Sequence, residues 1–329
     1  MKPLKEYLLN EATSVSNMQP RNRKELTILV KRLIKERGNE ADLNDIDTSK
    51  IDDMSKLFEY LKFNGDIPKW DVSNVENMRF IMQPRNNKEL KELVKKLIRE
   101  RGNEADLNDI DTSKITDMGN LFEGSEFNGD ISKWDVVNVK NVRFMFFNSE
   151  FNGDISKWDV SKVENMEGMF DDSTFNGDIS KWDVRNVKNM SWMFDHSKFN
   201  GDISKWDVRK VENMEGMFAD STFNGDISKW DVRNVENMDS MFWDSKFNGN
   251  ISKWDVSKVK NMGGIFWESE FNGDISKWDV SKVENMENMF AYSEFNGDIS
   301  KWNVKNVKKM RFMFLNSPLE KNPPKWYKE

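Results

Sequence analysis

The residues that could carry acid–base or nucleophilic chemistry are nearly all repeated along the chain. His196 is the single histidine, in a position that other repeats fill with Asp, Glu, Tyr or Asn. A Ser-His-Asp arrangement would need one serine and one carboxylate beside it, and no supporting motif surrounds His196. The pair Asp154 and Asp159 offers general acid–base groups, yet almost every repeat has its counterpart. We therefore expect a surface histidine, structural carboxylates and no catalytic residue.

Signatures for cofactors and metals are missing from the sequence. It has no phosphate-binding glycine loop, zinc signature or dinucleotide fingerprint, so we expect no cofactor and assign no metal site. The Asn-Gly-Asp turns are similar to turns of calcium-binding solenoids, but their spacing differs and Asn250 replaces Asp in one of them. Calcium is therefore disfavoured, and these side chains are expected to bond turn backbone. A weaker enzyme hypothesis places a site at residues 82–102, where the pattern is interrupted.

The composition excludes several kinds of partner. The 329 residues have a formal net charge of −7, and no block of Lys and Arg outweighs its acidic neighbours, whereas a nucleic-acid-binding face must neutralise phosphates. No run approaches the roughly 20 apolar residues of a membrane span. The absence of Cys excludes disulfides and thiolate metal sites. The 13 Trp and 23 Phe supply large side chains for a packed core.

A 24-residue repeat organises the sequence. Trp keeps this step from Trp134 to Trp302, Trp326 extends it into a partial last repeat, and Phe recurs at 127, 151, 175, 199, 223, 247, 271 and 295. A longer duplication, offset by 64, matches residues 18–81 with 82–145. These patterns divide the chain into a tail (1–17), a cap helix with a short first module (18–82) and a second cap helix with a long solenoid (83–329). We expect a break or hinge in the stack of repeats near residues 82–102.

Each repeat is predicted to form one coil of an α/β solenoid that is similar to leucine-rich repeats. In SKWDV (156–160), Trp158 and Val160 alternate with polar residues, as in a short strand with one buried face. Apolar residues then fall at helical spacing over 163–170, and Gly153 in the FNGD turn is expected to supply a positive φ. One coil cannot bury its apolar face alone, so copies stack and each apolar position becomes a core column.

Two segments that precede repeats are predicted to be cap helices. In the first, Asn22 and Glu25 have the spacing of a capping box, and Gly38 stands where a helix ends. The second segment repeats this arrangement with Asn86 and Gly102. Their apolar stripes would cover the open end of a stack. The alternative, a membrane-surface helix, is disfavoured because Lys and Arg alternate with Glu.

The repeat resembles that of a known family. DISKWDVSKVENMEGMF (154–170) is similar to the repeat of a bacterial surface-protein family of unknown function, related to the BspA-like leucine-rich repeats. ADLNDIDTSKITDMGNLF (105–122) is similar to the segment that opens arrays in that family. The resemblance, over roughly residues 39–329, implies a solenoid with a role in adhesion or protein binding and no known catalysis. Surface members carry an export signal or anchor; none is visible here, so we expect the cytoplasm or a virion.

The first twelve residues suggest a second context. MKPLKEYLLNEA resembles the capsid-targeting peptides of internal head proteins of tailed phages, which are cut after Glu in a Leu-x-Glu sequence. The resemblance implies processing between Glu11 and Ala12. The alternative is a terminal helix with no targeting role. The second functional hypothesis is therefore a virion or assembly-associated structural or cargo protein.

The positions that vary between repeats form the candidate partner-binding surface. The slots equivalent to residues 168, 171 and 172 vary freely and hold the aromatic residues Phe144, Phe147, Trp192, Trp243, Trp267, Tyr292 and Phe312. Helical geometry predicts that Trp192 is exposed, and exposed aromatics on a regular scaffold are candidate anchors for a protein partner. The alternative is drift in unconstrained slots, with rings that fold onto neighbouring coils. We predict a non-catalytic repeat protein that binds a protein partner by multivalent contact, through these slots or through the uniform Lys/Asp face of the repeated strand.

Overall fold

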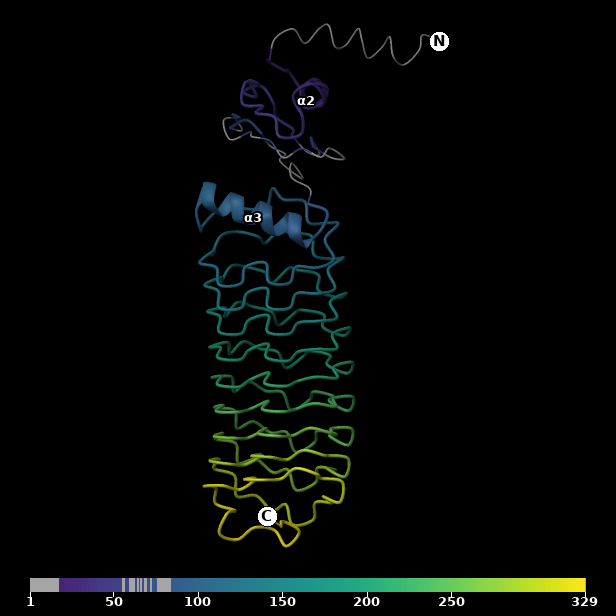
Figure 1. Cartoon of the computed structure of the whole chain (residues 1–329), viewed down its shortest axis with the longest axis vertical. Helices are drawn as coiled ribbons and strands as arrows, with labels where there is room; N and C mark the ends of the chain where they lie inside the picture. The colour runs from purple at the N-terminus through teal and green to yellow at the C-terminus, as the bar shows by residue number, and fades with distance from the viewer. Residues whose placement is uncertain are drawn as a thin grey trace, which may run out of the picture. The chain divides into compact units, whose positions relative to one another are not determined.

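The computed structural model describes residues 18–54, 57–58, 63, 65, 67, 70–71, 73–75 and 84–328. The chain forms two compact units: residues 1–84 with 108–112, and residues 85–107 with 113–329. The first contains helix α2 (Arg23–Arg37) and the second helix α3 (Asn87–Arg101), which are labelled in Figure 1. Across the described residues, no helix has the length and apolar character needed to span a bilayer. Glu11 and Ala12 lie outside the described residues.

Both helices begin and end at the residues that the sequence predicts. Asn22 accepts a hydrogen bond from the backbone N–H of Glu25, and the Glu25 carboxylate accepts one from the N–H of Arg21. The carboxylate thus bonds one residue further out than in the usual capping box. The same two bonds recur in α3. Gly38 and Gly102 follow the helices with φ of 90°, a region that favours glycine.

Helix α2 packs its apolar stripe into the core of the first unit. The buried residues of the helix are Leu26, Leu29, Val30, Leu33 and Ile34. They share one cluster with buried residues of the following segment, including Ile46, Ile51 and Met54. Trp70 joins this core, and its indole N–H donates to the carbonyl of Leu43 over 2.8 Å. The apolar stripe of α2 therefore packs against the segment that follows the helix in the same unit.

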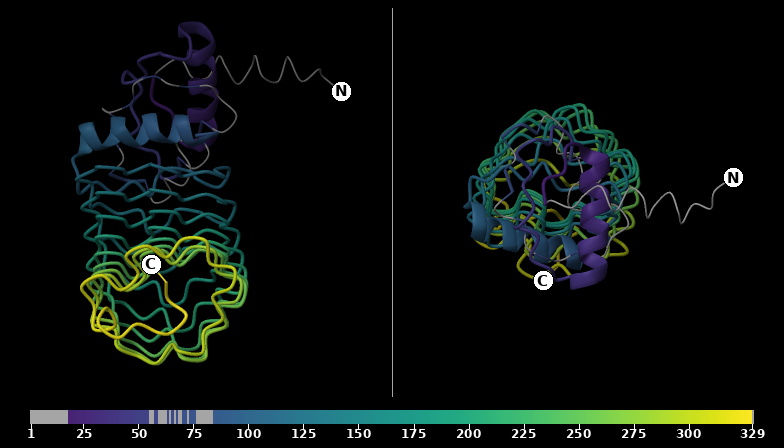
Figure 2. Two further views of the ribbon diagram at one scale, coloured as in Figure 1. Left: turned by 60° about the horizontal axis from the view of Figure 1, so that its bottom comes forward. Right: turned by 90° about the horizontal axis from the view of Figure 1, so that it is seen from above.

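The second unit is a stack of coils that repeat every 24 residues (Figures 1 and 2). Parallel bridges join successive coils through one Asn column, from Asn141 with Asn165 to Asn261 with Asn285. Backbone N–H groups also donate to carbonyls of the next coil, as Phe144 does to Glu167 over 2.7 Å. The predicted register of one coil per repeat is confirmed, and this unit is a solenoid.

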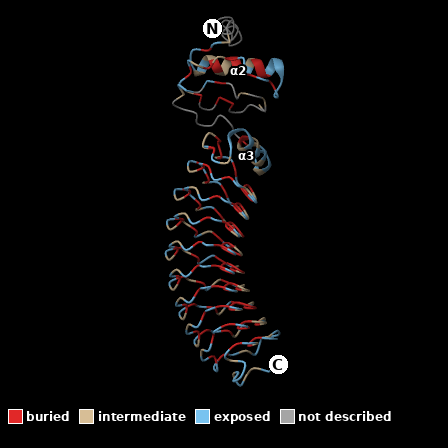
Figure 3. Ribbon diagram, turned by 90° about the vertical axis from the view of Figure 1, so that its left-hand side faces the viewer, coloured by how far each residue is buried: buried red, intermediate tan, exposed pale blue. Residues whose placement is uncertain are grey.

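The apolar columns of the sequence form the core of this solenoid, where the same buried positions recur in coil after coil (Figure 3). Trp158 is 5% exposed and Phe170 is fully buried. The rings of Phe146 and Phe170 stack with their centroids 5.7 Å apart. The indole N–H of Trp158 donates to the carbonyl of Ile131 in the preceding coil over 3.2 Å. Each Trp of the column therefore fills the core and also bonds two coils together.

The predicted strand at 156–160 is not observed. Burial alternates as expected, with Trp158 and Val160 buried, but the backbone turns: the N–H of Trp158 donates to the carbonyl of Ile155 over 3.1 Å. The reason lies in the preceding carboxylate. Asp154 accepts a hydrogen bond from the backbone N–H of Ser156 over 2.9 Å, and such an Asx turn competes with an extended ladder.

The predicted helical piece at 163–170 is also replaced by turns. Asn165, within this stretch, is the residue that bridges neighbouring coils. Its side-chain oxygen accepts a hydrogen bond from the N–H of Glu167 over 3.0 Å. Asparagine in this role stabilises a turn rather than a helix. The described coils of the second unit thus consist of turns and isolated bridges, and the α/β details of the predicted repeat are not confirmed.

The glycine of the FNGD turn has a different role from the predicted one. Gly153 is not among the residues with positive φ. A Cβ atom at this position would lie 2.8 Å from the ring of Phe151, much closer than ordinary van der Waals contact. Glycine is therefore required because the Phe ring of the same repeat folds over it, and the requirement is one of packing.

Candidate binding surface

The variable slots lie on two consecutive turns whose backbone is left-handed at two positions. In every coil of the second unit, the residues in slots 168 and 172 have positive φ. In the first turn, the N–H of Met169 donates to the carbonyl of Met166, so that Gly168 is its third residue. This is where a type II turn requires positive φ. We call the surface formed by slots 168, 171 and 172 of these coils the variable face.

Two of the predicted aromatic anchors are exposed on the variable face. The side chains of Tyr292 and Phe312 are 50% and 47% exposed, and they lie in adjacent coils. The guanidinium carbon of Arg311 lies 5.0 Å from the centre of the Phe312 ring, as in a cation–π contact. An exposed aromatic pair with a neighbouring arginine has the composition of an interface anchor.

Two other predicted anchors lie over glycines of the next coil. A Cβ atom at Gly168 would lie 2.1 Å from the ring of Phe144, and one at Gly216 would lie 2.1 Å from the ring of Trp192. Trp192 is half-buried, so the prediction that it is exposed is wrong. The prediction assumed a helix, whereas the left-handed turn lays the ring along the stack. Phe144 and Trp192 thus fold onto neighbouring coils, as the alternative interpretation expected.

The remaining predicted anchors, Phe147, Trp243 and Trp267, are half-buried. Phe147 packs edge-on against Phe144 at 5.8 Å between ring centroids. Trp243 and Trp267 occupy the same slot in adjacent coils and stack at 5.3 Å. The indole nitrogens of both Trp residues are buried and have no hydrogen-bond partner. This differs from the core Trp column, where each N–H described bonds a carbonyl, as in Trp230 with Ile203.

The variable face also contains a polar cluster around His196 that sequence reasoning missed. Nδ1 of His196 lies 2.9 Å from Oδ1 of Asp195, and Nε2 lies 3.1 Å from Oδ2 of Asp220. Asp171 occupies the slot of Asp195 in the preceding coil, and these two carboxylates and the imidazole offer ligand atoms within 4.8 Å of one another. The signal was available: residues 24 apart are neighbours in a stack, so an Asp slot and a His slot meet.

The titratable side chains of this cluster shift one another's pKa values. Burial raises the pKa of Asp171 to about 7, and the neighbouring charge of Asp195 adds to the increase. Burial also raises the pKa of Asp195, although His196 opposes that change. Burial by itself would lower the pKa of His196, but the carboxylates of Asp195 and Asp220 outweigh it, so that the pKa is raised. The arrangement concentrates negative charge around one imidazole.

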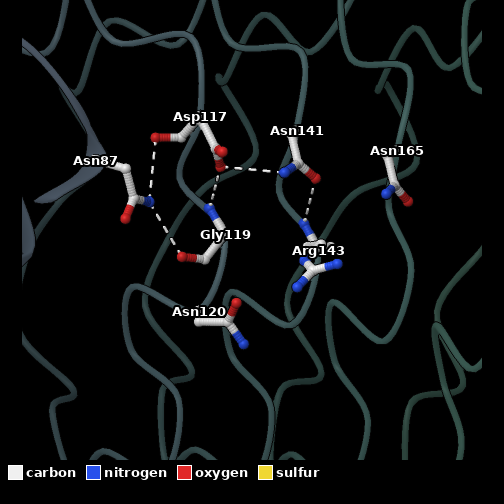
Figure 4. Close-up of a pocket in the computed structure, with 7 residues that line it drawn as sticks. All are labelled: Asn87, Asp117, Gly119, Asn120, Asn141, Arg143 and Asn165. Carbon is white, nitrogen blue, oxygen red and sulfur yellow. Dashed lines mark hydrogen bonds between the residues drawn. The ribbon is translucent and has the colours of Figure 1, made fainter.

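An open polar hollow of about 330 Å³ lies beside α3 (Figure 4). The side-chain amide of Asn87 donates to the carbonyls of Asp117 and Gly119 over 3.3 and 3.0 Å. The Asp117 carboxylate accepts hydrogen bonds from the N–H of Gly119 and the amide of Asn141. Because these contacts join the helix to the first coils, we assign the hollow to the cap. In residues 84–102, the described part of the predicted junction site, the chain forms α3.

The stacked coils define the class of the molecule: it contains a tandem-repeat solenoid closed by a helix. The chain belongs to the family described as Mycoplasma protein of unknown function, DUF285, which matches residues 29–92, 88–198, 151–247, 172–269 and 245–327. No curated protein and no solved structure matches the chain. The predicted membership of a repeat family of unknown function is confirmed, and the relation to BspA-like leucine-rich repeats stays a prediction.

Proposed function

We propose that this protein is a non-catalytic binding module that contacts a protein partner through the variable face. The observation that carries the proposal is which residues occupy the left-handed positions. Positive φ favours Gly and, among other residues, Asn and Asp, and drift in an unconstrained turn would keep to these types. Tyr292 and Phe312, which are exposed, nevertheless occupy such positions, with φ of 57° and 59°. Their presence against the backbone preference supports selection for the aromatic side chain.

The indole groups of Trp243 and Trp267 support the same proposal. A buried donor without an acceptor costs about 1–3 kcal/mol, and both indole nitrogens are in this state. Phenylalanine fills the same slot at Phe147 without this cost. The two Trp residues are therefore poorly explained by folding alone, whereas Trp is the residue type most enriched in interface hot spots.

The chemistry of the variable face favours a protein as the occupant. The exposed Tyr292, Phe312 and Arg311 lie in adjacent coils, and the cluster around His196 adds carboxylates to the same face. Aromatic and guanidinium groups combined with acidic ones suit a polypeptide surface of mixed character. Phosphate backbones would be repelled by these carboxylates and by the net charge of −7.

The test compares two variants of the full-length chain. The face variant carries Trp243→Phe, Trp267→Phe, Tyr292→Asn and Phe312→Ser, which are residues found in the same slots of other coils. The control carries Lys157→Gln and Lys181→Gln, at exposed positions of the 156–160 turn and its equivalent. Proteins from the natural source that the unmodified chain retains are identified by mass spectrometry. The affinity of each purified partner for the unmodified chain, the face variant and the control is then measured by calorimetry.

A partner whose affinity falls at least tenfold for the face variant and is unchanged for the control supports the proposal. A partner that binds the face variant as tightly as the unmodified chain contradicts it. Far-ultraviolet circular dichroism of both variants establishes that the coils are intact, so that a loss of affinity is a loss of contacts.

A further inference from the structure

Within the described residues, one group of metal-ligating side chains has its ligand atoms close together. Asp171, Asp195 and His196 each offer one such atom, and the three atoms lie within 4.8 Å of one another. Ligands of one tetrahedral zinc ion, bound at about 2.0–2.2 Å, lie roughly 3.5 Å apart. Small side-chain rotations would therefore bring all three atoms into one coordination sphere. The three residues come from two adjacent coils, so the backbone bonds between the coils hold the group together.

The state of Asp195 is the second and separate indication. The residue is 7% exposed, and its Oδ1 atom is buried without a hydrogen-bond partner. Nδ1 of His196 lies 2.9 Å from this oxygen, which is ion-pair distance when the imidazole is protonated. Buried carboxylate oxygens in proteins are almost always bonded or coordinated. A buried oxygen that contacts an imidazole and lies near a second carboxylate is therefore placed as a metal ligand would be.

The surroundings of the imidazole complete the pattern of a metal-binding histidine. Nε2 of His196 lies 3.1 Å from the Asp220 carboxylate, on the nitrogen that does not face Asp195. A carboxylate in this place commonly orients a ligating imidazole and selects its tautomer. Among the ion pairs of the described residues, none joins Asp171, Asp195 or Asp220 to a Lys or Arg side chain. Among the described residues, the imidazole of His196 is therefore the group that pairs with these carboxylates, and it carries a positive charge only when protonated.

We propose that Asp171, Asp195 and His196 bind one divalent transition-metal ion, with Asp220 as the residue that positions the imidazole. One nitrogen and two carboxylate ligands suit Zn²⁺, which also accepts water in a fourth position. Calcium would require six to eight oxygen ligands, more than these three side chains supply. The site is independent of the protein-binding proposal, because it rests on the local contacts of four side chains.

The experiment titrates the chelator-treated full-length chain with zinc chloride in a calorimeter and with cobalt chloride in a visible spectrometer. The ligand variants are Asp171→Ala, Asp195→Ala and His196→Asn, because Ala and Asn occupy these slots in other coils and should preserve the fold. Asp220→Asn tests the positioning role. The matched control is Asp244→Asn, in the same slot as His196 in a coil where Trp243 replaces the neighbouring Asp.

We expect one equivalent of Zn²⁺ to bind the unmodified chain and the control with equal affinity. Each ligand variant should bind at least 100-fold more weakly, and Asp220→Asn about 10- to 100-fold more weakly. The cobalt complex should show visible absorption bands that change in His196→Asn. The proposal is overturned if the unmodified chain binds no single equivalent, or if the ligand variants bind as it does. Circular dichroism of each variant distinguishes lost ligands from lost folding.

Discussion

Single polar residues in each coil bond the turns of their own repeat. Asp154 accepts from Ser156, Asp159 from Ser161 and Asn165 from Glu167. The Asn side chain of the FNGD turn bonds the neighbouring coil instead: Asn128 accepts a hydrogen bond from the backbone N–H of Asn152 over 2.8 Å. These bonds confirm the prediction that the repeated carboxylates and amides bond turn backbone. This structural role accounts for the recurrence of the same side chains in every coil.

Acid should destabilise the solenoid through these turn carboxylates. The hydrogen bond from Ser156 holds the pKa of Asp154 below its ordinary value, and equivalent serines do the same for Asp178, Asp202 and Asp226. A pKa that is lower in the folded chain stabilises the fold above the unfolded-state pKa, and this stabilisation is lost as the pH falls through the folded value. Melting temperatures measured from pH 6 to pH 3 should therefore fall below about pH 4.

The matched variant replaces these four Asp residues with Asn. Asn250 already occupies this position in one coil and accepts from the N–H of Ser252 over 3.0 Å, so the turns should survive. The variant should melt close to the unmodified chain at pH 6 and lose less stability below pH 4. An equal loss in both proteins would show that other groups dominate acid unfolding.

The same Trp→Phe substitution should have opposite consequences in the core and on the variable face. Trp230→Phe removes the indole donor to Ile203 and leaves a buried carbonyl unpaired, at a cost of about 1–3 kcal/mol. Trp243→Phe removes a buried indole donor that has no acceptor, so the free energy of unfolding should stay the same or rise, by up to about 1–3 kcal/mol. Urea unfolding of both variants measures the difference. Equal destabilisation would remove one argument for a binding role of Trp243.

At the scale of elements, α3 closes an end of the stack that would otherwise expose carbonyl groups. Within the stack, carbonyls of one coil accept from N–H groups of the coil before it, as Asn141 does from Met118. No coil of the second unit precedes residues 117–119, and there the Asn87 side chain supplies the donors to Asp117 and Gly119. The helix also buries three apolar side chains, those of Leu90, Val94 and Leu97, as a helix that covers the apolar end of the stack should.

Loss of this amide should loosen the first coil. Asn87→Ala leaves two carbonyls without this donor, and each lost hydrogen bond should lower the local stability by about 0.5–1.5 kcal/mol. Local opening of the first coil therefore becomes easier. Hydrogen exchange followed by mass spectrometry should be faster in residues 118–124 than in the unmodified chain and unchanged in central coils. Lys88→Ala, at a largely exposed position of the same helix, is the control. Unchanged exchange in Asn87→Ala would mean that helix packing alone closes the end.

Elements also show what the sequence could and could not predict. Cap helices, core columns and the period of 24 were predictable, because burial and capping follow from residue type and spacing. The strand at 156–160 was not, since alternating burial fits both a strand and an Asx turn; only the Asp154–Ser156 spacing distinguished them. The prediction that Trp192 is exposed was wrong because it assumed a helix. The group around His196 needed one further step, the pairing of each residue with its neighbour 24 positions away.

At the scale of the whole solenoid, each coil contacts its neighbours through bonds that repeat with the sequence. Removal of residues 223–246, one complete period of 24, should therefore leave a folded stack. Trp254 would then donate to Ile203 where it now bonds Ile227. Repeat stability is approximately a sum over coils and interfaces, so the shortened chain should unfold cooperatively at a lower temperature. Removal of residues 223–234 leaves half a coil at one junction and prevents the coils on its two sides from stacking in register, so this chain should unfold at a lower temperature than the chain that lacks the full period. An equal or higher melting temperature would contradict the stacking register.

Site-specific photo-crosslinking in the natural source tests whether a protein partner contacts the variable face. A photoreactive phenylalanine analogue replaces Tyr292 in one chain and Lys181 in another, both exposed positions of the solenoid. We expect a covalent adduct with a defined partner from position 292 and none from position 181. Adducts to the same partner from position 181 alone, or equally from both positions, would contradict this expectation.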